Sequence, residues 1–317
     1  MPTEFHQLSW DETLADDCRQ LVRLAVREDL ERGHDWTTVA LVAAGRRGRA
    51  AIVAREAGIV CGLRAAENVI DEMEAGIEIS PQLADGDAVA AKQVVAQLAG
   101  SARDLLTCER TILNFMGRLS GIATLTREYI ERAAQISASE TQPRVRIYDT
   151  RKTTPGWRRL EKYAVRCGGG WNHRTGLFDA VLIKDNHLAL ASEAKLSPAA
   201  AVELVRDNLR QMLPDTSQEM VIEVEVDSLA QWQDVLSVAP DVVLLDNLPP
   251  ATLREAVAIR DASAPSVLLE ASGGVNLQTI AAIAATGVDR ISVGALTHSA
   301  RTLDLGLDWL GNGADDQ

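Results

Sequence analysis

The chain has 317 residues, of which 46% are hydrophobic, 24% charged and only 4% aromatic, and its formal net charge is −13 at pH 7. The length suits one large barrel or two domains, and the scarcity of aromatic residues favours parallel strands covered by helices over an antiparallel sandwich. The acidic balance argues against nucleic acid as a partner. With no apolar run near the roughly 20 residues of a membrane span, no signal-peptide pattern and four scattered cysteines, we expect a soluble cytoplasmic protein.

The first part of the chain mixes helical and strand-like patterns. The spacing of apolar residues predicts a helix over residues 11–32, and short apolar runs predict strands over 50–54, 59–61 and 94–99. A second helix is expected over residues 63–75. Ser101 has the character of an N-cap for a longer helix, which Gly117 and Gly121 are expected to interrupt. These patterns indicate a small α+β domain.

From about residue 144 the chain alternates strands and helices. The predicted strands lie at residues 145–148, 180–183, 221–226, 242–245, 267–269 and 291–293, and the predicted helices at 198–213, 228–238, 251–260 and 277–285. A spacing of roughly 22–25 residues between the later strands is typical of a parallel α/β array. Residues 122–138 or the early chain could hold a seventh strand, and the sequence leaves this open.

Polar or glycine residues come directly after these strands. In a (β/α) barrel the carboxyl ends of all strands meet at one mouth, whereas in an open doubly wound sheet they spread along an edge. Six successive strands that deliver such residues favour a barrel. The residues in question are Arg151, Lys152, Lys184, Glu225, Asp246, Ser272, Gly273 and Gly294.

A strongly basic segment lies within this acidic chain. Residues 144–174 contain nine Lys or Arg and two acids, a local charge of +7, so the rest of the chain carries −20. Cations beside the glycine turn at 168–170 predict a pocket for a small, multiply charged anion. The predicted cationic set is Arg151, Lys152, His173, Arg174 and Lys184, whereas a solvated face is an equally good account of Arg144, Arg146, Arg158, Arg159 and Lys162.

Two acids on successive strands, Glu225 and Asp246, belong to the same predicted pocket. They could hold Mg²⁺, bind ribose hydroxyls or stabilise a cationic transition state, or they could only form salt bridges to the cationic set. Glu223 shares the face of Glu225 if the strand is regular.

The last two strands end in small residues that favour phosphate binding. Ser272 and Gly273 follow one strand and Gly294 follows the next, a pairing that recurs in phosphate sites of barrels. His298 lies within reach of the second loop and is either a ligand or a structural histidine. The loop at residues 153–156 is either a mobile flap over the site or an ordinary connection.

In their order along the chain, these motifs resemble the quinolinate phosphoribosyltransferase family. The resemblance covers nearly the whole chain, although the turn between Leu30 and Asp35 is longer than the family pattern. The matching segments are residues 28–30, 109–114, 149–156, 168–179, 182–187, 223–226, 245–247, 270–274 and 292–298.

The resemblance implies an N-terminal α+β sandwich domain at residues 1–120, an incomplete α/β barrel at 121–296 and a C-terminal segment, 297–317, that returns to the first domain. It implies that quinolinate and phosphoribosyl pyrophosphate become nicotinate mononucleotide, CO₂ and pyrophosphate, with Mg²⁺, in de novo NAD biosynthesis. It also implies a homodimer with shared active sites.

The family's site residues map onto this sequence by the same resemblance. Arg110 would reach the neighbouring subunit's barrel and bind a quinolinate carboxylate. The barrel's own residues would fall into three groups: Arg151, His173, Arg174 and Lys184 on the quinolinate side, with Lys152 between the substrates; Glu225 and Asp246 at the ribose and metal; Ser272, Gly273, Gly294 and His298 at the 5-phosphate.

Three alternatives stay open at this point. A relative with the same barrel could act on nicotinate without decarboxylation, although several arginines favour a dicarboxylate. A Schiff-base aldolase could use Lys152 or Lys184, and borohydride trapping would reveal it. A non-catalytic phosphosugar-binding protein would bind the sugar donor and release no pyrophosphate.

Overall fold

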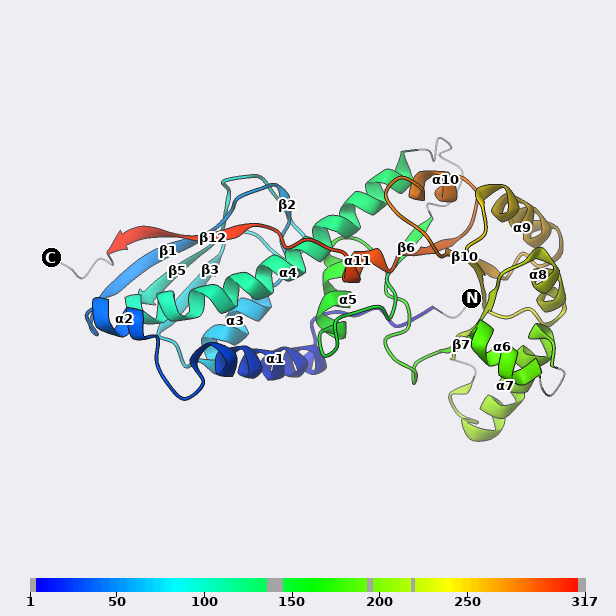
Figure 1. Ribbon diagram of the computed structural model, residues 1–317, viewed down its shortest axis with the longest axis horizontal. Helices are drawn as coiled ribbons and strands as arrows, with labels where there is room; N and C mark the ends of the chain where they lie inside the picture. Colours follow the sequence, from blue (N-terminus) through cyan, green and yellow to red (C-terminus); the bar gives the residue numbers. More distant parts are fainter. Residues whose placement is uncertain (1–3, 136–144, 193–195, 218–219, 313–317) are drawn as a thin grey trace. The chain divides into compact units, whose positions relative to one another are not determined.

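The computed structural model describes residues 4–135, 145–192, 196–217 and 220–312 (Figure 1). It forms two compact units. The barrel unit consists of Met1–Gln7, Glu128–Lys152 and Gly170–Ala295, and the sandwich unit of Leu8–Arg127, Thr153–Gly169 and Leu296–Gln317. Arg144, the first basic residue of the cationic segment, lies outside the described residues.

The barrel unit contains a six-stranded, all-parallel sheet with the order β6-β11-β10-β9-β8-β7. Most residues of these strands are apolar and buried, as expected for parallel strands covered by helices. In the described part of the chain β6 and β7 form the two edges, so the α/β barrel is incomplete, which confirms the predicted fold class. The strands are β6 (Arg146–Tyr148), β7 (Val181–Ile183), β8 (Ile222–Val226), β9 (Val242–Asp246), β10 (Leu268–Ser272) and β11 (Arg290–Ser292).

Two of the helices between these strands begin with a serine cap. Ser197 caps α7 by accepting the Ala200 N–H, and Ser228 caps α8 by accepting the Gln231 N–H. The six predicted strands and the four predicted helices of this region are all present, with ends shifted by a few residues. The helices are α6 (Asp185–Ser192), α7 (Pro198–Met212), α8 (Leu229–Val235), η2 (Leu236–Val238), α9 (Pro250–Ser263) and α10 (Ile280–Ala284), and α11 (Ala295–His298) follows β11.

The sandwich unit contains a four-stranded antiparallel sheet with the order β12-β1-β5-β3. Its last strand in sequence, β12 (Leu305–Asn312), pairs with β1 (Arg47–Ala54), so the C-terminal segment is part of this unit. The other strands are β5 (Val94–Ser101), β3 (Ile77–Pro81) and the short pair β2 (Gly58–Ile59) and β4 (Ala88–Val89). The helices are α1 (Glu12–Leu30), α2 (Trp36–Leu41), α3 (Leu63–Glu72), α5 (Arg158–Cys167) and α4 (Ala102–Ala134), whose residues from Glu128 onward belong to the barrel unit.

Helix α4 is not interrupted at Gly117 or Gly121, so that expectation was wrong. Both glycines lie where the chain before β12 crosses the helix: a Cβ on Gly121 would be 1.9 Å from the Arg301 carbonyl oxygen. The Leu303 N–H donates to the Gly117 carbonyl over 3.0 Å. These glycines therefore allow two backbones to approach closely and do not mark a break.

Helix α4 also fills residues 122–134, so no strand forms there. Residues 136–138, the end of the region where a seventh strand was considered, lie outside the described residues. Among the helices of the described chain, none has an apolar stretch long enough to traverse a bilayer.

Candidate active site

The carboxyl ends of the barrel strands bring an acid and a base into contact. Lys184 follows β7 and Glu225 lies near the end of β8, and Nζ of Lys184 is 3.1 Å from Oε2 of Glu225. The lysine side chain is 45% exposed and the glutamate 13% exposed. This ion pair therefore lies at the rim of the barrel mouth, where an incoming substrate can reach both groups.

Asp246 ends β9, the next strand of the sheet, and lies opposite Ser272 at the end of β10. The Asn247 N–H donates to the Ser272 carbonyl, and the Asn247 amide donates to Asp246 over 2.7 Å. Gly273 has φ +85°, and a Cβ there would be 2.3 Å from the Asn247 side-chain oxygen. The two strand ends are thus fastened together, and only glycine fits at position 273.

The segment after the glycine turn is anchored by a buried acid that the sequence analysis did not include among the site residues. Asp149, fully buried after β6, accepts the His173 N–H over 2.9 Å and the Asn172 amide over 2.6 Å. The N-terminal segment adds a second anchor, because Gln7 exchanges hydrogen bonds with the Asn172 backbone and Phe5 packs on the His173 ring with centroids 4.2 Å apart. His173 is therefore held from two sides.

Two of the predicted cations lie close enough to repel each other. The pKa of Arg174 is lowered by burial and by the charge of Arg151, and partly restored by Glu223. Arg174 is 6% exposed and its guanidinium donates to the Ala180 carbonyl over 3.2 Å. Two guanidinium groups of this kind favour the binding of an anion with more than one carboxylate.

Two carboxylates are fully buried inside the barrel, Glu223 on β8 and Glu270 on β10. Burial is the main cause that raises the pKa of each to about 7, and neighbouring acids add to it: Glu225 for Glu223, and Glu223 for Glu270. Both approach Nε2 of His173, with distances of 2.8 Å for Glu223 Oε2 and 3.7 Å for Glu270 Oε1. Glu270 was not among the predicted site residues.

The remaining predicted residues are placed as follows. Lys152 is exposed on the loop after β6, and its N–H donates to the Thr150 hydroxyl over 3.0 Å. Gly294 follows β11. Arg110 is exposed on α4, and His298 ends α11 with Nδ1 2.7 Å from the Ser299 hydroxyl; both belong to the sandwich unit.

The basic residues considered as a solvated face behave differently from one another. Lys162 is fully buried, so that reading was wrong for it. Arg146 pairs with Glu4 over 2.8 Å.

In the sandwich unit, Thr154 of the 153–156 loop donates through its N–H and its hydroxyl to Glu161, which anchors one side of this loop. Whether the loop moves stays a prediction.

Comparison with known proteins gives a consistent result over both units. Residues 122–308 match the model of the quinolinate phosphoribosyl transferase C-terminal domain, and residues 35–120 match that of the N-terminal domain. A nicotinate-nucleotide pyrophosphorylase (carboxylating) of Mycobacterium leprae is 44% identical over 295 residues, which are 92% of this chain and 97% of that protein. A probable enzyme of the same name from Synechocystis is 41% identical over 90% of each chain.

A solved structure agrees with these sequence matches. The nicotinate-nucleotide pyrophosphorylase from Francisella tularensis superimposes with a TM-score of 0.83 at 36% identity, covering 96% of this chain and all of that one. With both domain models and the relatives in agreement over nearly the full length, the chain belongs to the quinolinate phosphoribosyltransferase family.

Proposed function

We propose that the protein transfers the phosphoribosyl group of phosphoribosyl pyrophosphate to quinolinate and releases pyrophosphate and CO₂, forming nicotinate mononucleotide for NAD biosynthesis. The observation that carries this proposal is the pairing of Lys184 with Glu225 over 3.1 Å at the carboxyl ends of one parallel sheet, beside Asp246 at the end of β9, in the unit that also holds the arginines Arg151 and Arg174. The arginines suit a dicarboxylate, and the acids suit a sugar that gains positive charge as pyrophosphate departs.

The residues on the base side have a binding role in this account. Arg151, Arg174 and Lys184 surround quinolinate, with His173 beside Arg174, and Lys152, on its exposed loop, neutralises negative charge between the two substrates. Ser272, Gly273 and Gly294 hold the 5-phosphate, and the ligand role of His298 stays a prediction. The fastened turn at Asn247 and Gly273 supports this, because it fixes backbone N–H groups without a side chain in the way.

The reaction needs no protein nucleophile. As the bond to pyrophosphate breaks, the anomeric carbon becomes cation-like, and the carboxylates of Glu225 and Asp246 stabilise it. The ring nitrogen of quinolinate then forms the new bond and becomes a pyridinium. The bond between the ring and the adjacent carboxylate breaks with its electron pair left on the ring, CO₂ departs, and a proton replaces it on that carbon.

The acids also fit a bound Mg²⁺. Glu225 and Asp246 present carboxylate oxygens at the ends of neighbouring strands, the hard ligands that Mg²⁺ prefers alongside substrate phosphates. Lys184 and Asn247 each occupy one oxygen of these acids, and within the described residues the other two oxygens are available. Bound Mg²⁺ would neutralise the charge of the departing pyrophosphate.

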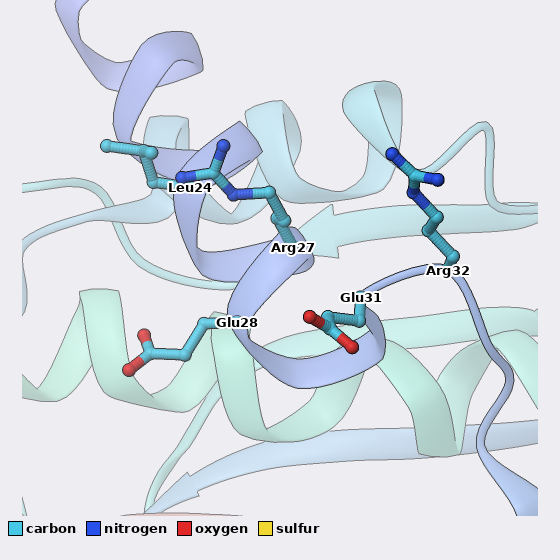
Figure 2. Close-up of a pocket in the computed structure, with 5 residues that line it drawn as sticks. All are labelled: Leu24, Arg27, Glu28, Glu31 and Arg32. Carbon is cyan, nitrogen blue, oxygen red and sulfur yellow. The ribbon is translucent and has the colours of Figure 1, made fainter.

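A homodimer and a cytoplasmic setting complete the proposal. In the sandwich unit, the apolar residues Leu24, on α1, and Trp36 and Leu41, on α2, are 51%, 70% and 81% exposed, and a partner chain could cover them. A pocket of about 720 Å³ lies at the end of α1. Its lining residues, drawn in Figure 2, are Leu24, Arg27, Glu28, Glu31 and Arg32. The four thiols are free, which fits a reducing compartment.

This exposed region adjoins Arg110, since the Thr111 hydroxyl donates to Asp29 near the end of α1 over 3.1 Å. Leu106 and Arg110 are exposed one helical turn apart on α4. We propose that a second copy of the chain covers this region and receives Arg110 in its barrel.

The test is pyrophosphate release from phosphoribosyl pyrophosphate and quinolinate as Mg²⁺ is titrated after chelation. We expect no release without Mg²⁺, and a higher Mg²⁺ requirement in Asp246→Asn than in the wild type. Full activity in excess chelator would contradict the metal assignment, and an unchanged Mg²⁺ requirement in Asp246→Asn would remove this acid from it.

A further inference from the structure

The hydrogen bonding of His173 determines which of its ring nitrogens carries the proton. The backbone N–H of Arg174 donates to Nδ1 of His173 over 2.8 Å. A nitrogen that accepts a hydrogen bond has no proton of its own, so the neutral ring carries its proton on Nε2. His173 is 5% exposed, and Phe5 lies against its ring, so the ring cannot turn over without displacing other buried groups.

The protonated nitrogen faces two acids from different strands. Glu223 Oε2 lies 2.8 Å and Glu270 Oε1 lies 3.7 Å from Nε2, and both carboxylates are fully buried. Their approach to a single N–H stabilises the Nε2–H form over the other tautomer, because that form alone presents a donor to the acids and an acceptor to Arg174.

His173, Glu223 and Glu270 have the composition of a metal site, with one nitrogen and two carboxylate ligands close together. The Arg174 N–H argues against this reading. A metal ion among the acids would need the lone pair of Nε2, which would move the proton to Nδ1 and set two N–H donors against each other. The geometry therefore fits a ring that accepts the Arg174 N–H at Nδ1 and lies in electrostatic contact with the acids at Nε2, and not a cation site.

We infer that Glu223, assisted by Glu270, is a positioning residue that holds His173 as the neutral Nε2–H tautomer, and that Nδ1 of His173 in turn fixes the backbone of Arg174 for quinolinate. This inference rests on the proposed function. It assigns His173 a neutral state in place of the cation expected from the sequence. Glu223 acts through His173 and Arg174 and does not itself touch the substrate.

The inference is tested by ¹⁵N–¹H correlation spectra of the histidine rings in the full-length protein, with His173→Gln used to assign the signal. We expect the wild type to show the Nε2–H pattern. In Glu223→Leu, which has similar volume and no acceptor, we expect mixed tautomers. A wild-type His173 with its proton on Nδ1, or on both nitrogens at neutral pH, would overturn the inference.

Quinolinate binding, measured by calorimetry without turnover, supplies a second readout. Glu223→Gln keeps an oxygen acceptor, so this variant extends the test if Glu223→Leu folds poorly. We expect Glu223→Leu to weaken quinolinate binding by about tenfold, equivalent to about 1.4 kcal/mol, with sugar-donor binding unchanged, and Glu223→Gln to restore most of the loss. Glu203→Leu, exposed on α7, is the matched control.

The outcomes separate the two proposals. If the wild type, Glu223→Leu and Glu223→Gln all bind quinolinate equally well, the positioning role of Glu223 is overturned and the proposed function stays intact. Wild-type protein that does not bind quinolinate at all would overturn the proposed function and this role with it, whatever the spectra show.

Discussion

Nζ of Lys184 and Oε2 of Glu225 lie 3.1 Å apart across the ends of β7 and β8. The pair joins a cation assigned to quinolinate with a carboxylate assigned to ribose. Because the lysine is 45% exposed, the pair stabilises the fold by at most about 1 kcal/mol. Substrates can therefore separate the two groups at little cost in free energy. Glu225 can form this salt bridge in the free protein and also bind ribose.

The first prediction concerns Lys152, which we expect to neutralise charge between the substrates. Lys152→Ala should lower kcat by about 10²–10³-fold, as is usual when one preorganised electrostatic contact is lost, with an unchanged melting temperature because the side chain is exposed. Steady-state kinetics and circular dichroism measure the two effects. Arg210→Ala, a 65% exposed cation on α7, is the control and should retain wild-type kcat. Normal turnover in Lys152→Ala would remove this residue from the site.

The second prediction concerns Arg110 and the dimer. Arg110→Ala should raise the KM for quinolinate about tenfold or more, as expected for one lost charge-assisted contact, and should change the KM for phosphoribosyl pyrophosphate much less. An equal rise in both would contradict a carboxylate contact.

Mixed dimers test whether Arg110 serves the neighbouring barrel. A dimer of one Arg110→Ala chain and one Lys152→Ala chain should recover one working site, because a single barrel then has both an intact Lys152 and an intact Arg110 from its partner. If both residues served the same chain's site, every site of the mixed dimer would carry one defect, and no site with both the wild-type kcat and the wild-type KM for quinolinate would appear.

The third prediction follows from the buried Glu270, whose pKa burial raises from 4.5 to about 7. The folded protein binds this proton more tightly than the unfolded chain, so the associated stability is present below about pH 4.5 and is lost as the pH rises to about 7. Glu270→Gln, which imitates the protonated acid, should show a smaller fall in melting temperature over this interval than the wild type. The exposed control Glu203→Gln should keep the full fall; identical profiles for all three proteins would contradict a raised pKa.

The fourth prediction concerns the glycine under the C-terminal segment. In Gly121→Ala the new methyl group would lie 1.9 Å from the Arg301 carbonyl oxygen, and overpacking of this kind typically costs about 1–3 kcal/mol. Chemical denaturation should show this loss. Gly45→Ala, where a Cβ would meet no atom within 4 Å, should be close to neutral. Equal stability of the two variants would mean that the C-terminal segment does not pack on α4 as described.

The barrel strands could be predicted because each is a short apolar run between polar residues, a pattern that depends only on neighbours in sequence. The continuity of α4 could not be predicted from the sequence. Gly117 and Gly121 are compatible with a helix break until the chain at residues 301–303 is known to cross them, and nothing local reveals that crossing.

Some features of the site could likewise be predicted from the sequence, and others could not. Lys184, Glu225 and Asp246 could be identified because they directly follow or end predicted strands. The anchoring of Asn172 by Gln7 joins residues 165 positions apart, so no local pattern reports it. Glu270 had a usable signal, since an acid within an otherwise apolar parallel strand must be buried with a partner.

The most direct test of the account is an assay of the purified protein with quinolinate, phosphoribosyl pyrophosphate and Mg²⁺ that follows CO₂ and pyrophosphate together, with nicotinate replacing quinolinate in a parallel reaction. We predict equal amounts of CO₂ and pyrophosphate from quinolinate and neither product from nicotinate. Pyrophosphate without CO₂, or activity with nicotinate alone, would contradict the assignment of a decarboxylating transferase.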